Sequence, residues 1–305
     1  MTNPAPRVIS DLTDRSRPVL AADVTAYLDD IARTYGRQEG LLSSLILFGS
    51  AATGGYVPLL SDVDVLIVLS DDADPSAREH VRRGVGSLES QHGLGKLSGR
   101  TSGAVGHGLT GFADRVTANV RAFFICSRGD LLSGSPDRIL GISRVQAAFV
   151  DRVAIASIVA SATTVWGEDL LDTVPLPAIR RWDVAKAFFG LFSQALFPTV
   201  VYPFLPDATK YAMDTLKRSV HNCYFCHHAR PSVLSEEVAF LEARDGPSRT
   251  LRRLLELRRE YRPSYGFVIG CLPTLVGLHV RTARSVQFPR PARAKRSASG
   301  GATAA

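Results

Sequence analysis

The most constraining feature of this chain is a stretch in which two short apolar runs flank a glycine-serine pair. Residues 45–48 read Leu-Ile-Leu-Phe and stop at Gly49-Ser50, and residues 62–69 read Asp-Val-Asp-Val-Leu-Ile-Val-Leu. Short apolar runs bounded by turn residues, the second of them rich in β-branched side chains, are typical of strands buried in a sheet. Glycine and serine after the first run indicate a tight turn that opens a helix. The stretch therefore predicts two core strands connected through a turn at residues 49–50.

Two carboxylates, Asp62 and Asp64, begin the second predicted strand. Alternate residues of a strand point to the same side, so both side chains would leave one face, roughly 7 Å apart. Packing explains two such acids poorly, whereas hard divalent cations such as Mg²⁺ prefer oxygen ligands and are usually shared with substrate phosphates. Gly49 permits close backbone approach, and Ser50 would start a helix whose exposed amide groups favour a phosphate.

A Gly-Ser pair, eleven further residues and then Asp-x-Asp in an apolar strand resembles the signature of polymerase-β-type nucleotidyltransferases. Residues 48–68 (FGSAATGGYVPLLSDVDVLIV) are especially similar to bacterial aminoglycoside adenylyltransferases of the streptomycin/spectinomycin type and their relatives. More loosely, the resemblance extends over residues 24–175. It implies an α/β (α+β) catalytic domain with a mixed sheet, Mg²⁺ as cofactor, and an NTP, expected to be ATP, as donor to a hydroxyl acceptor. An aminoglycoside-like small molecule is one candidate acceptor.

The same resemblance implies roles for four residues. Gly49 and Ser50 would bind the triphosphate, and Asp62 and Asp64 would be the catalytic metal ligands. The alternative for an isolated Asp-x-Asp is a strand whose first residues merely cap its edge with charge. The turn at the expected distance favours the family interpretation.

The third acid that the resemblance implies is missing from the expected place. Residues 116–126 form the next predicted strand and contain no carboxylate. Asp114, just before this strand, is our predicted catalytic base, and Asp130 beyond its far end is a less plausible substitute. Because general acid–base catalysis needs a positioned proton acceptor, a catalytically inactive nucleotide-binding or interaction module of the same fold is the alternative function.

Helical periodicity dominates the chain beyond about residue 140 and predicts an all-α domain after the catalytic one. The predicted layout is a flexible arm at 1–20, a nucleotidyltransferase domain at 21–145, a helical domain at 146–287 and a disordered basic tail at 288–305. Relatives use basic side chains from the helical half to hold the triphosphate. Lys210 is therefore assigned to the nucleotide, with Lys217 as a second candidate and solvated surface lysines as the simpler explanation.

Composition limits the partners. A net charge of +7 favours anionic partners such as nucleotides, but the basic tail is short and poor in aromatic residues, so no specific nucleic acid is expected. The chain shows no apolar leader behind a basic start, which favours a cytoplasmic location.

Two uncharged stretches, residues 187–206 and 263–280, reach the length of a membrane span. Prolines and glycines interrupt both, which favours a buried helix pair, so no membrane partner is expected.

A Cys-x-x-Cys-His pattern lies at residues 223–227, within a stretch whose apolar periodicity predicts a helix. Haem attachment through such a pattern needs an exported protein, and a zinc site needs four well-spaced ligands. Cys223 and Cys226 share an apolar side of the predicted helix, so we interpret them as packing residues, with zinc as the alternative.

Overall fold

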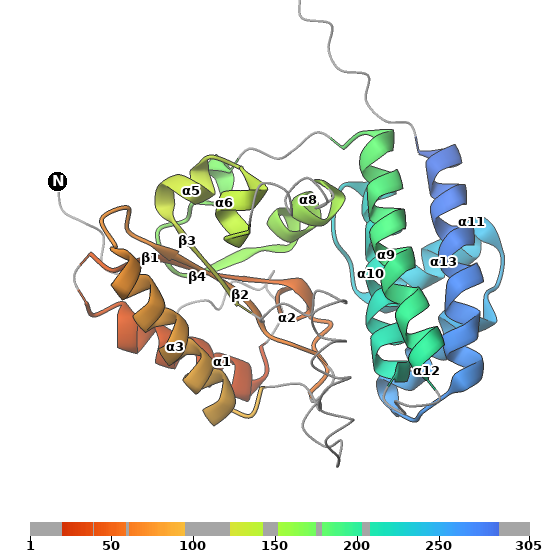
Figure 1. The fold of residues 1–305 in the computed structure, drawn as a ribbon, viewed down its shortest axis with the longest axis horizontal. Helices are drawn as coiled ribbons and strands as arrows, with labels where there is room; N and C mark the ends of the chain where they lie inside the picture. The colour runs from red at the N-terminus through yellow and green to blue at the C-terminus, as the bar shows by residue number, and fades with distance from the viewer. Residues whose placement is uncertain are drawn as a thin grey trace, which may run out of the picture.

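The computed structural model describes residues 20–38, 40–58, 61–94, 123–142, 152–174, 179–202 and 208–286. A sheet with helices on both faces forms one half, and five helices from the later part of the chain form the other (Figure 1). The predicted fold class, a mixed α/β domain followed by helices, is confirmed.

Four strands make up the sheet: β1 (Leu42–Phe48), β2 (Asp64–Leu69), β3 (Phe123–Ser127) and β4 (Thr163–Gly167). Their order is β3-β2-β1-β4. β1 pairs antiparallel with both β2 and β4, while β2 pairs parallel with β3. The central pair β1 and β2 is the pair of apolar runs predicted from the sequence.

Side-chain alternation along β1 gives the sheet two buried faces. Leu45 and Leu47 pack with α1 (Ala22–Tyr35) and α3 (Pro75–Gln91) on one side. Ile46 and Phe48 point to the other side, toward the elements that cover it in Figure 1. These are α5 (Arg128–Leu132), α6 (Pro136–Leu140), α8 (Arg152–Ser161) and the short 3₁₀ helix η3 (Leu171–Thr173). Burial on both faces explains why β1 and β2 are nearly continuous apolar runs.

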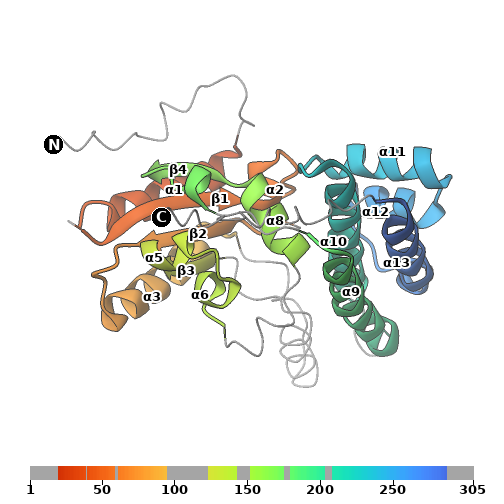
Figure 2. The ribbon, with the colours of Figure 1, turned by 90° about the horizontal axis from the view of Figure 1, so that it is seen from above.

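The second half contains α9 (Arg181–Val201), α10 (Ala208–His228), α11 (Leu234–Asp245), α12 (Arg249–Arg259) and α13 (Tyr265–Ser285). Figure 2 shows α9, α10 and α13 grouped together, with α10 nearest the sheet. In α12 the buried leucines are Leu251, Leu254 and Leu257. Leu255 is partly buried and packs against the hydrophobic cluster that contains them.

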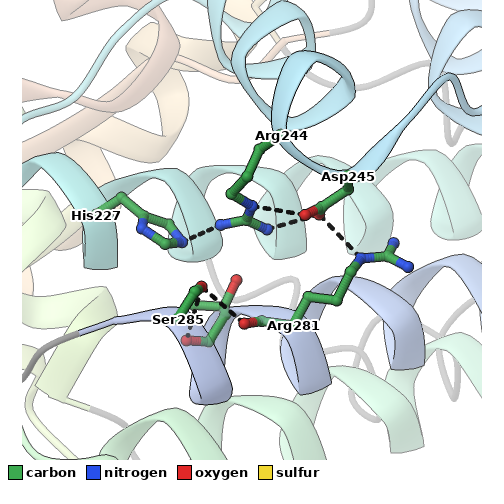
Figure 3. A network of polar contacts seen from close by, with 6 residues as sticks. His227, Arg244, Asp245, Arg281 and Ser285 are labelled. Atoms are coloured by element: carbon green, nitrogen blue, oxygen red, sulfur yellow. Dashed lines mark hydrogen bonds and ion pairs between the residues drawn. The ribbon is translucent and has the colours of Figure 1, made fainter.

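A polar network ties three of these helices together (Figure 3). Arg244 at the end of α11 contacts the Nε2 atom of His227 on α10 and forms an ion pair of 2.6 Å with Asp245. Arg281 on α13 reaches the same Asp245 carboxylate at 3.0 Å. Burial, aided by the charge of Arg244, lowers the pKa of His227 to about 4. These contacts therefore link α10, α11 and α13, and the lowered pKa keeps His227 neutral.

Residues 163–167 differ from the prediction. Only helices were predicted for residues 146–287, but α8 ends at Ser161 and the chain then enters β4, which pairs with β1. The sheet thus includes residues beyond 145. The proposed division at 21–145 and 146–287 remains a prediction.

Most of each uncharged stretch lies in α9 or α13, and both helices are long and apolar enough to cross a membrane. They were expected to be a buried pair. Only 28% and 39% of their most apolar windows are buried, however, so each helix packs one side into the protein and leaves another exposed.

Candidate active site

The turn after β1 brings the backbone into contact with a carboxylate. Gly49 begins the short helix α2 (Gly49–Ala52) with φ at +69°, a conformation that favours glycine. A Cβ atom placed on Gly49 would lie 2.4 Å from Oδ2 of Asp64. Phe48 and Asp64 are paired in the β1–β2 ladder, which places this carboxylate beside the turn. A side chain at position 49 would therefore displace Asp64.

The two predicted carboxylates occupy different local structures. β2 begins at Asp64, so Asp62 lies in the loop before the strand and not in the strand as predicted. Both side chains are partly exposed. The Tyr56 hydroxyl donates a hydrogen bond of 3.2 Å to Asp23 on α1. Burial and Asp23 raise the pKa of Tyr56 to about 12, and the charge of Asp62 adds to this rise. Asp62 therefore lies on the Tyr56 side of the site, and Asp64 lies on the Gly49 side.

Helix α10 carries a lysine, Lys217, that senses the charge of Asp64. Burial lowers the pKa of Lys217, while the charges of Asp214 and Asp64 oppose that lowering. Lys210 is two turns earlier on the same side of α10 and is buried, whereas Lys217 is half-buried. The pKa of Lys217, the second candidate from the sequence, thus responds to the charge of Asp64. A role for Lys210 remains a prediction.

Arg258 on α12 joins the helical half to the loop between the turn and the carboxylates. Its guanidinium donates hydrogen bonds of 3.2 Å to the Gly55 carbonyl and to Ser61 Oγ. Ser61 Oγ also accepts a hydrogen bond of 3.0 Å from the Val57 amide. Burial lowers the pKa of Arg258, and the charge of Asp214 opposes this. Arg258 thus holds both ends of the loop that leads to Asp62.

Sequence reasoning missed Arg258, Asp214 and Tyr56. One signal was available, since Arg258 follows Leu251 and Leu254 at steps of three and four and so falls on the apolar stripe of α12. An arginine in such a stripe indicates a buried polar partner.

Comparison with known protein families gives a match that covers the Gly49 turn and both carboxylates. Residues 30–93 match the family described as nucleotidyltransferase domain. This range contains Gly49, Ser50, Asp62 and Asp64. The chain carries a nucleotidyltransferase domain. The resemblance predicted from these residues is confirmed at the level of that domain.

The structure of spectinomycin adenyltransferase AAD(9) from Enterococcus faecialis with ATP and spectinomycin is a further match. It shows 12% sequence identity and a TM-score of 0.48, covering 84% of this chain and 98% of that chain. The sequence matches no curated protein.

Asp130, the less plausible substitute for a third carboxylate, lies away from Asp64. Asp130 forms a capping box with Ser127 at the start of α5 and lies 3.8 Å from the guanidinium of Arg78. Parallel pairing sets Ser127 beside Leu69, at the opposite end of β2 from Asp64. Five residues of strand separate these ends by roughly 17 Å. Asp114, our predicted base, lies outside the described residues.

The carboxylates of the candidate site fit a metal ion that takes its remaining ligands from the substrate and from water. Within the described ranges, no group of three or more His, Cys, Asp or Glu side chains is arranged to hold a metal ion. Asp62 and Asp64 offer hard oxygen ligands, and Mg²⁺ commonly completes its shell with water and substrate phosphates. These two residues would hold the ion beside the Gly49 turn.

The two cysteines of the Cys-x-x-Cys-His pattern lie in different parts of the core. Cys223 is fully buried among apolar residues of α10, α11, α12 and α13. Burial raises the pKa of its thiol to about 11. Cys226 packs against the cluster that contains Val153 and Ala156 of α8. Both positions agree with the packing interpretation.

Proposed function

We propose that the nucleotidyltransferase domain transfers a nucleoside monophosphate from a Mg²⁺-bound NTP to a hydroxyl acceptor and releases pyrophosphate. The observation that carries this proposal is the contact between the Gly49 backbone and the Asp64 carboxylate, together with the effect of that carboxylate on the pKa of Lys217 in the other half. A triphosphate is strongly anionic. Turn amides, a metal ion at the carboxylates and an ammonium group together offer the positive surroundings it needs.

In the proposed reaction the acceptor oxygen attacks the α-phosphorus, and the bond from that phosphorus to the bridging oxygen breaks. Asp62 and Asp64 would hold Mg²⁺, which neutralises phosphate charge when bound. Because burial lowers the pKa of Lys217, an arriving phosphate would favour its protonated form. Asp114 is proposed to take the proton of the hydroxyl, and Lys210 is proposed to add a second cation for the phosphates.

ATP is the proposed donor, and a small molecule with a free hydroxyl is the proposed acceptor. Support for this class comes from residues 48–68, whose sequence is similar to that of aminoglycoside adenylyltransferases. An aminoglycoside is therefore the first acceptor to test.

The test is Mg²⁺-dependent release of pyrophosphate from each of the four common NTPs with a panel of hydroxyl acceptors that includes aminoglycosides. Asp64→Asn should abolish release, because the amide keeps the shape of the side chain but removes a charge that the metal needs. Asp72→Asn is the matched control, since Asp72 is an exposed aspartate just beyond β2. Equal turnover in Asp64→Asn and the wild type would refute the assignment. Nucleotide binding without release for any acceptor would favour a non-catalytic nucleotide-binding module.

A further inference from the structure

Exposed apolar side chains are concentrated on two helices. Among the described residues, every large hydrophobic side chain that is strongly exposed belongs to α9 or α13. We call this set the apolar face. Its members are Trp182, Phe189, Leu196 and Val200 on α9, and Tyr265, Ile269 and Val280 on α13. Scattered exposed hydrophobics are normal on a soluble protein, but their concentration on one helix pair indicates a binding surface.

The two helices run antiparallel and present one common surface. Phe188, near the start of α9, packs on His279, near the end of α13, with ring centres 5.7 Å apart. At the other end, Tyr202 just after α9 packs on Tyr265 at 4.9 Å. Each residue turns the helix by about 100°. With these contacts as reference, the exposed positions of both helices fall on the same side of the pair.

Helix α9 is apolar on all sides, yet it is covered on only one. Its inner residues Leu191 and Ala195 pack on Leu275 of α13. Trp182, Phe189 and Val200, which lie opposite, are each more than 60% exposed. A helix that is hydrophobic all round is normally enclosed by protein or by lipid. We therefore expect the exposed side of α9 to bind a partner.

The exposed charged side chains at the ends of α9 and α13 are basic. The only acidic residue on either helix is Asp183, which is 5% exposed and accepts a hydrogen bond of 2.8 Å from the Arg180 amide. Arg181 and Arg284, at the neighbouring ends of α9 and α13, are exposed. The partner should therefore be both apolar and anionic.

We propose that the apolar face docks on the surface of a bilayer that contains anionic phospholipid. Aromatic and aliphatic side chains on one face, bordered by arginines, are the pattern of helices that lie in the membrane interface. Basic residues next to such a face add attraction to anionic headgroups. A second copy docked through the same face would bring the same arginines, and α9 and α13 offer no exposed acid to pair with them. This association would revise the expectation of no membrane partner.

The helices lie on the bilayer and do not cross it. α9 and α13 both pack against α10, which carries Lys217. Crossing the membrane would require these helices to leave α10 and would dismantle the helical half. If α9 and α13 lie flat on the bilayer, they keep all of their contacts with α10.

The test is co-sedimentation of the full chain with vesicles of phosphatidylcholine alone or mixed with phosphatidylglycerol. The wild type should bind only the mixed vesicles, and binding should fall as salt is raised. Phe189→Glu with Val200→Glu should weaken binding at least tenfold. Ala239→Glu with Ala243→Glu, at exposed sites on α11, is the matched control and should bind normally. Circular dichroism of all variants would verify that each is folded.

A second variant separates the electrostatic part. Replacing Arg181 and Arg284 by Gln should weaken binding by up to about fivefold per residue. Failure of the wild type to bind mixed vesicles, or equal binding by the face variant, would overturn the proposal. So would a wild-type dimer in light scattering that the face variant converts to a monomer, because the occupant would then be a second copy.

Discussion

Arg258 offers the sharpest test of how the two halves cooperate. Arg258→Met keeps most of the side-chain length but removes both hydrogen bonds to the loop, at Gly55 and Ser61. A hydrogen bond to a charged group contributes about 1.5–3 kcal/mol. Both bonds are 3.2 Å long, so we take the lower value and expect a loss of about 3 kcal/mol in the free energy of unfolding.

The same change should weaken nucleotide binding. Gly49 and Asp62 lie on either side of the loop that Arg258 holds, so a loosened loop must be reordered when Mg²⁺-NTP binds. If the whole loss appeared in binding, the affinity would fall about a hundredfold, which is the upper limit. Urea unfolding measures the first effect, and calorimetric titration with Mg²⁺-ATP measures the second.

Arg259→Met is the matched control, because Arg259 is the exposed neighbour on the same helix. A double-mutant cycle with Ser61→Ala isolates the contribution of one bond. Our reasoning is refuted if Arg258→Met unfolds within about 0.5 kcal/mol of the control, or if the cycle shows no coupling between Arg258 and Ser61.

Three further predictions test other parts of the structure. Gly49→Ala should lower stability by about 1–2 kcal/mol through backbone strain and reduce Mg²⁺-NTP affinity in calorimetry, because its Cβ would meet Asp64. Gly86→Ala, at an open helical site, should instead be neutral or stabilising, and equal affinity losses in both variants would contradict this reasoning. Asp114→Asn should lower turnover about 10²–10⁴-fold with little change in nucleotide affinity, and unchanged pyrophosphate release would discard Asp114 as the base. Burial lowers the pKa of His279 to about 4, so the folded state binds fewer protons than the unfolded state between pH 4 and the ordinary value of 6.5. Stability should rise with pH across this window, and His279→Leu should remove about 2 kcal/mol of the loss seen near pH 5; identical pH profiles in urea unfolding would contradict the pKa shift.

Local sequence signals located the central elements of the fold. The two apolar runs at residues 45–48 and 62–69 were predicted as core strands, and they form most of β1 and β2. The turn predicted at residues 49–50 opens the short helix α2. Such signals depend on a few neighbouring residues, which is why they can be read from one sequence.

Features set by distant contacts were not predicted. Thr163–Gly167 follows a helix and carries little periodicity, so its pairing with β1 could not be recognised. Arg258 is one of several arginines in a basic helix, and its role depends on how α12 docks against the first half. At the site, the Gly-Ser turn and the Asp-x-Asp strand were recognisable because their spacing is local. Lys217 depends on how α10 meets the sheet, so sequence alone left it an alternative to Lys210.

Because β4 pairs with β1, the sheet cannot be completed until residues 163–167 have been synthesised. Leu47 cannot pair with Thr163 until Thr163 has emerged from the ribosome, more than a hundred residues later. Until then one edge of β1, a strand that is buried on both faces, has unpaired amide and carbonyl groups, which invite pairing with other chains. Closing so long a loop is slow because its entropic cost precedes any contact energy. A nascent chain that stalls between β1 and β4 should therefore depend on chaperones to avoid aggregation.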